Sequence, residues 1–409
     1  MASEGGRVIV VGGGIVGSAT ALALARAGYQ TTVVDPAPGA GASAGNAGLV
    51  VPSYATPMST PANLGAGLRA LGGGGGGPAL ALPLGPATAS WLVRFALACR
   101  PGRVRRDTVR LHRLAQESHE AYYRLQSEGL DLRLRRAGWL WVTTRGSAGR
   151  LAADAARLRA AGATCDVVDA DGVRALEPAV GGPARAGLWF PDESVVDPSR
   201  ACAALLGAAV EGGAVVRATS VLEVDRREGR VRSVLTGQGR LEVDHVVLAT
   251  GASTRAVGRM FGVRAPVEPG YGWSLTLAGG GVVQRALMDL DDHVVISPFG
   301  DAVRVTGGME FGGRPGASPR PEALQHLRDV ATRLVPRLAE LEEVRSWRGA
   351  RPMTPSGVPV VGRRRGTANV VVAAGHGPLG VTLAPSTAAG VLAVLGSTPS
   401  PPADVLAGR

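Results

Sequence analysis

The sequence of 409 residues contains no lysine, so all 44 of its basic side chains other than histidine are arginines. Set against 33 acidic residues, they give a net charge of +11. Such a balance can indicate binding to nucleic acid or to an anionic membrane surface. The arginines are scattered over helical stretches such as 104–113 and 152–160, without the interleaved aromatic residues that bind single strands. We expect a solvated basic surface, no nucleic-acid partner and, as the alternative, at most a peripheral membrane contact.

Aromatic residues make up only 4% of the chain, so Ala, Val and Leu must form most of the interior. The three cysteines, Cys99, Cys165 and Cys202, lack metal-ligand spacing, and so sparse a count suits a reducing compartment. We predict that each is buried and that there is no metal site. The N-terminus has no signal-peptide pattern, and no run of about 18 apolar residues is uninterrupted. These absences predict a cytoplasmic protein without a spanning helix; the alternative is one that is peripheral to the inner face of the membrane.

Residues 7–35 have the pattern of a strand–helix–strand unit. The apolar run 8–11 is typical of a strand buried on both faces, and a glycine turn follows it. A helix is expected over 17–27 and a second strand over 31–35. This order is that of the unit that binds dinucleotides.

The glycines of this turn have the spacing of a dinucleotide fingerprint. Gly12 permits the tight turn, Gly14 lets the backbone approach a pyrophosphate, and Gly17 lets the helix pack on the strand. The pyrophosphate would lie on the N–H groups of the first helical turn. Asp35 ends the second strand at the spacing expected for an acceptor of a ribose hydroxyl. The predicted cofactor contacts of this unit are Gly12, Gly14, Ile15, Val16, Gly17 and Asp35.

Two kinds of segment alternate along the chain. Strand–helix units occur at the start, middle and end, and strand-rich segments lie between them. This order predicts an α/β protein in which a Rossmann-like nucleotide-binding domain is interleaved with a mostly antiparallel substrate-binding sheet. The glycine run 72–77 is expected to be flexible. The predicted division is 1–52, 146–262 and 346–396 for the nucleotide domain, 53–145 and 263–345 for the substrate domain, and 397–409 for a frayed tail.

A second motif indicates which dinucleotide binds. The strand 245–251 ends in Ala249-Thr250-Gly251, which resembles the second FAD motif of flavoproteins with two dinucleotide-binding domains. No second complete GxGxxG is present to hold a separate nicotinamide cofactor. The resemblance favours FAD as the sole dinucleotide, reduced directly by a substrate.

The resemblance extends over nearly the whole chain, to the D-amino-acid oxidase superfamily. It is greatest to D-amino-acid dehydrogenase of the small-subunit type and to glycine oxidase. Three segments carry it: GASAGNAG at 41–48 with PSYATP at 52–57, RPMTPSGVPVVG at 351–362, and AGHGPLGVT at 374–382. Relatives of the sarcosine oxidase type use a Lys over the flavin and a Cys for covalent attachment. This chain has no Lys and no Cys at 384–387, so we expect non-covalent FAD and a dehydrogenase or a differently built oxidase.

The resemblance also implies further cofactor contacts. The C-terminal loop would pass the pyrimidine end of the flavin, where backbone N–H groups stabilise negative charge on the reduced ring. His376 would either contact the flavin ring or hydrogen-bond to backbone and shape the loop. The contacts implied in this way are Ser43, Asn46, Ala47, Gly48, Val221, Thr250, Gly251, Gly375, His376, Gly377, Leu379, Gly380, Val381 and Thr382.

Substrate recognition is expected to depend on an arginine. Arg351 matches the family's carboxylate-binding Arg before Pro, and a guanidinium binds a carboxylate through two parallel hydrogen bonds; alternatively, it pairs with a structural acid. Trp273 replaces the Tyr that the family carries, so it either alters the substrate or is a core residue, and Tyr271 could compensate. Glu310 either faces an amine or is a structural acid. The predicted substrate contacts are Arg351, Trp273, Tyr271, Tyr54, Glu310 and His376.

The leading hypothesis is an FAD-dependent oxidoreductase that oxidises the C–N bond of a D-amino acid or related carboxylate-bearing amine. A hydride equivalent would pass from Cα to flavin N5, so no side-chain nucleophile is required. The electron acceptor would be oxygen, a quinone or another redox partner. One alternative is an oxidase of an unusual secondary amine or N-substituted glycine, suggested by Trp273. Another is a flavin-bearing electron-transfer subunit of a hetero-oligomer.

Overall fold

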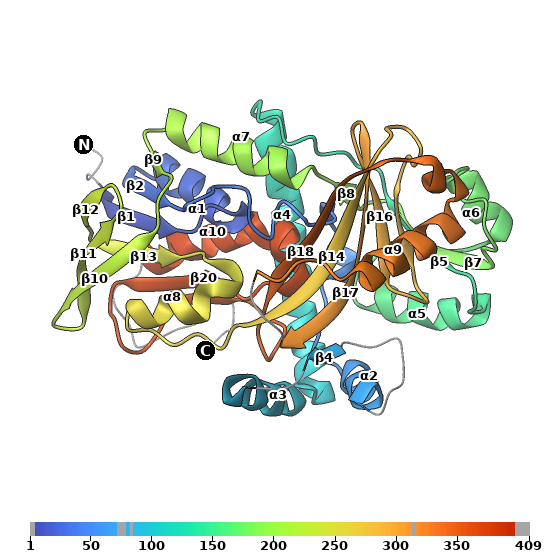
Figure 1. Ribbon diagram of the computed structural model, residues 1–409, viewed down its shortest axis with the longest axis horizontal. Helices are drawn as coiled ribbons and strands as arrows, with labels where there is room; N and C mark the ends of the chain where they lie inside the picture. The colour runs from blue at the N-terminus through green and yellow to red at the C-terminus, as the bar shows by residue number, and fades with distance from the viewer. Residues whose placement is uncertain (1–4, 72–78, 82–84, 313–315, 397–409) are drawn as a thin grey trace.

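The computed structural model describes residues 5–71, 79–81, 85–312 and 316–396. The predicted glycine run 72–77 and the predicted tail 397–409 lie outside these residues. The molecule is elongated, with a six-stranded sheet in one half and a nine-stranded sheet in the other (Figure 1). The two kinds of segment expected from the sequence therefore do form two sheets.

The six-stranded sheet has the order β19-β20-β13-β1-β2-β9 and is parallel except for β19. Its central strand β1 is buried on both faces, as the apolar run 8–11 predicts. Val8 and Val10 face one hydrophobic core, while Ile9 and Val11 face another. The strands are β1 (Gly5–Val11), β2 (Tyr29–Val34), β9 (Val215–Arg217), β13 (His245–Leu248), β19 (Val360–Arg363) and β20 (Val370–Ala374).

Different elements cover the two faces of this sheet. On one side α1 packs against α7 and α10, and α10 also packs against α4. On the other side lie α8 and a small antiparallel sheet, whose valines share a core with β1. The elements are α1 (Ile15–Arg26), α4 (Pro101–Ser127), α7 (Pro198–Glu211), α8 (Thr254–Met260), α10 (Gly380–Gly396), β10 (Val221–Arg227), β11 (Arg230–Thr236) and β12 (Gly239–Glu242).

The nine-stranded sheet is mixed, with the order β18-β14-β17-β16-β15-β5-β7-β6, and β4 pairs with β17. Period-2 alternation divides its side chains between two cores: Leu140 and Val142 face α9, whereas Trp139 and Trp141 face the opposite side. The strands are β4 (Ala79–Ala81), β5 (Trp139–Thr143), β6 (Asp166–Asp169), β7 (Ala186–Phe190), β14 (Glu268–Ala278), β15 (Ala286–Asp289), β16 (Val294–Phe299), β17 (Ala302–Gly312) and β18 (Glu343–Met353).

The remaining elements are short or peripheral, and α2 and α3 project from the main body (Figure 1). The predicted burial of all three cysteines is confirmed. The other helices and strands are α2 (Pro61–Leu71), α3 (Pro86–Ala98), α5 (Ala148–Ala160), α6 (Ala170–Leu176), α9 (Pro321–Leu334), β3 (Leu49–Val50) and β8 (Ser194–Val195), with 3₁₀ turns η1 (Pro52–Tyr54), η2 (Gly251–Ser253), η3 (Pro336–Glu340) and η4 (Gly377–Leu379).

Strands β6 and β7 join the nine-stranded sheet, although the predicted division gave 146–262 to the nucleotide domain. The two ends of the family motif 351–362 belong to β18 and β19, and helix α10 begins at Gly380 and continues through Pro385. In each case pairing or packing with distant residues decides the structure.

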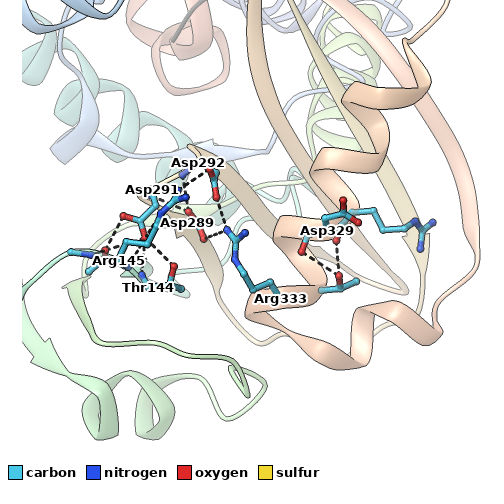
Figure 2. Close-up of polar contacts among 11 residues, drawn as sticks. Thr144, Arg145, Asp289, Asp291, Asp292, Asp329 and Arg333 are labelled. Atoms are coloured by element: carbon cyan, nitrogen blue, oxygen red, sulfur yellow. Dashed lines mark hydrogen bonds and ion pairs between the residues drawn. The ribbon is translucent and has the colours of Figure 1, made fainter. Parts of the chain in front are cut away.

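A cluster of charges joins β5, β15 and α9 (Figure 2). Asp291 accepts hydrogen bonds from the backbone N–H groups of Thr144 and Arg145. Arg333 of α9 pairs with Asp289, at 3.2 Å, and with Asp292. Among the residues that the structure describes, no group of three or more His, Cys, Asp and Glu is placed to hold a metal ion. The arginines neutralise these aspartates and tie the ends of three elements together.

One helical stretch in the described part of the chain, Gly377–Gly396, is long and apolar enough to cross a membrane. From the sequence we predicted no spanning helix, because no apolar run of about 18 residues is uninterrupted. However, 72% of it is buried in the structure, where α10 packs against α1 and α4. Its apolar character is that of a core helix.

Candidate active site

The glycine turn after β1 has the geometry that the fingerprint predicts. Gly12 has φ of 106°, a conformation that favours glycine. A Cβ at Gly17 would lie 1.8 Å from the carbonyl oxygen of Gly12, so helix α1 approaches the turn as closely as only glycine permits. No acidic side chain occupies the first turn of α1, which leaves its positive end available to an anion.

Asp35 lies beside this turn, at the end of β2. Its carboxylate accepts hydrogen bonds from the N–H groups of Gly13, at 2.7 Å, and Ala37, at 2.8 Å. These bonds fix the carboxylate at the mouth of the turn. Ser43 Oγ, from the following loop, accepts from the N–H of Ile15 at 3.0 Å.

A cavity of about 600 Å³ runs from this turn to the edge of the nine-stranded sheet. Residues from both sheets line it, together with the loop 41–46 and the start of α10. It therefore joins the predicted pyrophosphate site to the predicted substrate arginine. The predicted residues along it are Gly12, Gly14, Ile15, Val16, Asp35, Ser43, Asn46, Val221, Thr250, Gly251, Arg351, His376, Gly377, Gly380 and Val381.

The guanidinium of Arg351 lies on a floor formed by Gly272. Gly272 of β14 and Gly349 of β18 are cross-strand partners. A Cβ at Gly272 would lie 2.3 Å from the guanidinium of Arg351, so the guanidinium occupies the space that a side chain there would fill. Its Nη1 donates to the carbonyl oxygen of Gly308 at 2.6 Å, and no carboxylate of the described residues forms an ion pair with it. Burial lowers the pKa of Arg351 to about 10, so the side chain is still charged near neutral pH.

Tyr54 lies close enough to Arg351 to interact with its charge. Burial raises the pKa of the Tyr54 phenol, and Arg351 opposes this effect. The ring makes edge contacts with Trp139 and Trp141, at centroid distances of 5.3 and 5.7 Å. The N–H of the preceding residue, Ser53, donates to the buried Glu193 carboxylate at 2.9 Å. These contacts hold the Tyr54 segment near the arginine.

His376 is buried at the start of the C-terminal loop and lines the cavity. Its Nε2 lies 2.8 Å from Thr387 Oγ1 of α10. Burial lowers the pKa of the imidazole to about 4, so it is neutral near pH 7. The hydrogen-bond partner of the His376 ring is therefore the Thr387 side chain and not backbone. A contact with the flavin ring, the other predicted role, stays a prediction.

Trp273, Tyr271 and Glu310 lie on the other face of the sheet from Arg351. Residues that alternate along a strand point to opposite faces, and Arg351 shares its face with Gly272. Trp273 packs in the core under α9, which is one of the two roles that the sequence left open for it. Tyr271 lies under the Arg348 guanidinium, 3.5 Å from the ring centroid. Glu310 pairs with Arg320 at 2.7 Å and Arg348 at 3.4 Å, so it is a structural acid.

Several predicted cofactor residues support the cavity without lining it. Thr382 Oγ1 donates to the carbonyl oxygen of Leu49 at 3.0 Å and so joins α10 to β3. Leu379 is buried in the core beneath α1. The N–H of Gly48 donates to Asn46 Oδ1 at 2.8 Å, which shapes the loop. The predicted cofactor contacts that do not line the cavity are Gly17, Ala47, Gly48, Gly375, Leu379 and Thr382.

Sequence patterns missed three residues that build this site. Arg304 of β17 donates to the carbonyl oxygens of Ala44 and Asn46, at 2.6 and 3.2 Å, and so holds the loop 41–48. The Trp347 indole covers Gly349 on the Arg351 face, because a Cβ there would lie 1.4 Å from its ring. Glu193 supports the Tyr54 segment. The roles of Arg304 and Glu193 depend on contacts between segments distant in sequence, which no local pattern contains. For Trp347 the sequence offered one signal, the glycine two residues later, Gly349, over which the indole lies.

A family model described as FAD dependent oxidoreductase, DAO, matches residues 7–393. The chain belongs to this family. Its members bind FAD, and the chain is an FAD-dependent oxidoreductase. The resemblance stated from the sequence is thereby confirmed.

Curated relatives of this oxidoreductase cover nearly its whole length. A D-amino acid dehydrogenase of Methylobacterium nodulans is 35% identical, with 92% of each chain covered. One of Dechloromonas aromatica is 34% identical, over 97% of this chain and 98% of the relative. A solved glycine oxidase of Bacillus cereus shares the fold, with a TM-score of 0.74 and 18% identity over 95% and 94% of the two chains. The predicted fold class is thus confirmed.

The residues of the oxidoreductase's cavity fit FAD. The glycine turn itself lines the cavity through Gly12 and Gly14, so a pyrophosphate could lie against its backbone, and glycine at 12 and 17 lets the turn pack closely against β13 and α1. Asp35 offers an acceptor next to it, and the cavity continues to Arg351 and His376. When bound, FAD supplies the acceptor for a hydride equivalent.

We predict that Gly17→Ala removes most of the bound flavin, because the new Cβ forces the Gly12 turn out of place. The measurement is the ratio of flavin to protein absorbance after purification. Gly207→Ala is the matched control, since nothing lies within 4 Å of its added Cβ in α7. A Gly17→Ala protein with full flavin content would contradict the fingerprint assignment.

We predict that Glu193 makes stability depend on pH. Burial raises the pKa of its carboxyl to about 7 from an ordinary 4.5. The folded protein then binds this proton more tightly than the unfolded chain, so the contribution to stability falls as pH rises from about 4.5 to 7. The slope is at most about 1.4 kcal/mol per pH unit.

Urea unfolding of Glu193→Gln across this range should show a flatter dependence, since Gln keeps an acceptor for the Ser53 N–H. Glu120→Gln, at an exposed position of α4, is the control and should keep the original slope. Equal slopes in the Glu193→Gln and unmodified proteins would refute the prediction.

Proposed function

We propose that this enzyme oxidises the C–N bond of a D-amino acid, or of a related amine that carries a carboxylate. The observation that carries the proposal is the charged Arg351 guanidinium, which lies on its glycine floor at the end of the cavity lined by the FAD fingerprint. The curated relatives at 34 and 35% identity, which are named D-amino acid dehydrogenase, support the D configuration.

Arg351 would bind the substrate carboxylate and fix the position of Cα. Its hydrogen bond to the Gly308 carbonyl uses part of the guanidinium and sets its plane, which leaves other N–H groups for a carboxylate. Tyr54 adds a hydroxyl near the same charge. Because burial strengthens charge-assisted hydrogen bonds, this pair can hold a carboxylate against competition from water.

The reaction balances without a catalytic nucleophile. Bound FAD would supply the acceptor for a hydride equivalent from Cα, and loss of a proton from the amine nitrogen would complete the change of the C–N bond to an imine. Water hydrolyses the imine to a keto acid and ammonia, or an amine if the nitrogen is substituted. The reduced flavin would then pass its two electrons to an acceptor, which is oxygen, a quinone or another redox partner. His376 contributes a neutral imidazole at the cavity wall.

The alternatives have lost support. The secondary-amine hypothesis depended on Trp273, which faces the core under α9. The electron-transfer subunit would not need an arginine anchor beside the cofactor cavity. We also propose that residues 53–145 and 263–345, together with β6 and β7 of the same nine-stranded sheet, form the substrate-binding domain.

The direct test is anaerobic bleaching of the flavin by a panel of D-amino acids, L-amino acids and N-alkyl glycines. We expect D-amino acids to bleach the flavin fastest. Faster bleaching by L-amino acids or N-alkyl glycines would overturn the proposed substrate class. An absence of bleaching by every compound would count against C–N oxidation altogether.

We predict that Arg351→Ala lowers kcat/KM by about 10- to 100-fold, the value of one or more charge-assisted hydrogen bonds, mainly through KM. Flavin content should be almost unchanged, because Arg351 lies away from the glycine turn. Arg345→Ala, at an exposed position of the same strand, is the matched control and should leave KM unchanged. A normal KM in Arg351→Ala would exclude the anchor role.

A further inference from the structure

The indole of Trp347, on β18, lies between its own strand and the loop 41–48, which lines part of the cofactor cavity. A Cβ at Gly45 of this loop would lie 2.1 Å from the indole, and a Cβ at Gly349 would lie 1.4 Å from it. Neither glycine has a positive φ, so the backbone conformation does not require glycine at either position. The absence of a side chain at both positions gives the indole its place.

The same indole is a neighbour of the proposed substrate anchor. Gly349 and Gly272 are cross-strand partners, so their Cβ positions would lie about 5 Å apart on one face of the sheet. The Trp347 ring covers Gly349, and the Arg351 guanidinium covers Gly272. The indole and the guanidinium therefore lie side by side on this face. Because Arg351 lines the cofactor cavity and Trp347 does not, the indole lies beyond the space expected for FAD.

Arg304 holds the loop residues on either side of Gly45. Its guanidinium donates to the carbonyl oxygens of Ala44, at 2.6 Å, and of Asn46, at 3.2 Å. These hydrogen bonds join the loop to β17, whereas the anchor belongs to β18. Trp347 adds a contact between the loop and the strand of the anchor itself.

We propose that Trp347 is a positioning residue that sets the distance between the loop 41–48 and the Arg351 guanidinium. The proposal rests on the proposed function, in which Arg351 binds the substrate carboxylate. The anchor fixes Cα from one side and the loop borders the cofactor cavity from the other, so their separation determines how Cα meets the hydride acceptor. A large planar side chain packed between two backbone segments keeps this separation constant.

The experiment is anaerobic reduction of the flavin-loaded full chain by the D-amino acid that bleaches it fastest, followed by flavin absorbance after rapid mixing. We expect Trp347→Ala to lower the limiting rate constant per bound flavin by about tenfold or more, because misplacement by about 1 Å can cost about 100-fold. The dissociation constant of the substrate should change little, since Arg351 keeps its contact with Gly272 and its hydrogen bond to Gly308. Trp347→Phe retains an aromatic ring and should keep most of the rate.

Hydrogen–deuterium exchange gives a second readout that needs no substrate. The amides of the loop 41–48 should exchange faster in Trp347→Ala, because the loop loses its contact with β18. This readout separates the two proposals. If no amino acid reduced the flavin, the proposed function would fail, whereas exchange would still decide whether Trp347 holds the loop. Unchanged exchange would overturn the positioning role.

The matched control is Trp189→Ala. The Trp189 indole is also half-buried and also covers a glycine, since a Cβ at Gly138 would lie 1.8 Å from its ring, but it packs on the core under α9. This variant should leave the rate constant and the exchange of the loop unchanged.

An equal fall of the rate constant in Trp189→Ala would overturn the proposal in favour of a general loosening of the sheet. A normal rate constant per bound flavin in Trp347→Ala, with or without loss of flavin, would overturn it in favour of a structural role. A rise in the dissociation constant alone would also overturn it, because the indole would then be a substrate contact.

Discussion

The double burial of β1 is the constraint on which the rest of the structure depends. A strand with apolar side chains on both faces must be covered by two layers, and here helices α1 and α10 cover one side and α8 with the small sheet covers the other. The chain can leave β1 only at its end, where Gly12 makes the turn. Since the parallel partners β2 and β13 end at the same edge, Asp35 and Thr250 meet that turn. The cofactor cavity therefore lies at the carboxyl edge of the sheet.

Local features could be predicted from the sequence because their causes are local. The glycine spacing, the apolar run 8–11 and the position of Asp35 specify a structure within a short stretch of chain. The place of Arg351 near the cavity followed from a resemblance, not from its neighbours. What no local pattern contains is the face to which a strand residue points. The sequence left open whether Trp273 contacts the substrate or lies in the core. The register of β14 against β18 places its side chain on the other face of the sheet from Arg351, in the core under α9.

Contacts between distant segments explain the other omissions. Arg304 holds the loop 41–48 from β17, and Glu193 holds the Tyr54 segment from the residues before β8. An isolated Arg or Glu on a strand or loop is read as a surface residue, because charged groups are rarely buried. Only the three-dimensional arrangement shows that both side chains form hydrogen bonds to backbone of a distant segment. These bonds position the loop 41–48 and the Tyr54 segment beside the cavity.

The exclusive use of arginine links the interior to the surface. A guanidinium offers five donors in one plane, and it remains charged when burial lowers its pKa, as at Arg351. A buried ammonium would lose its charge more readily in the same place. The same planar group stacks on Tyr271, lies over Gly272 and lines an open groove. Arginine thus serves in two settings: inside, where Arg351 keeps its charge, and on an outer face, where Arg94 and Arg264 form no ion pair with the described residues.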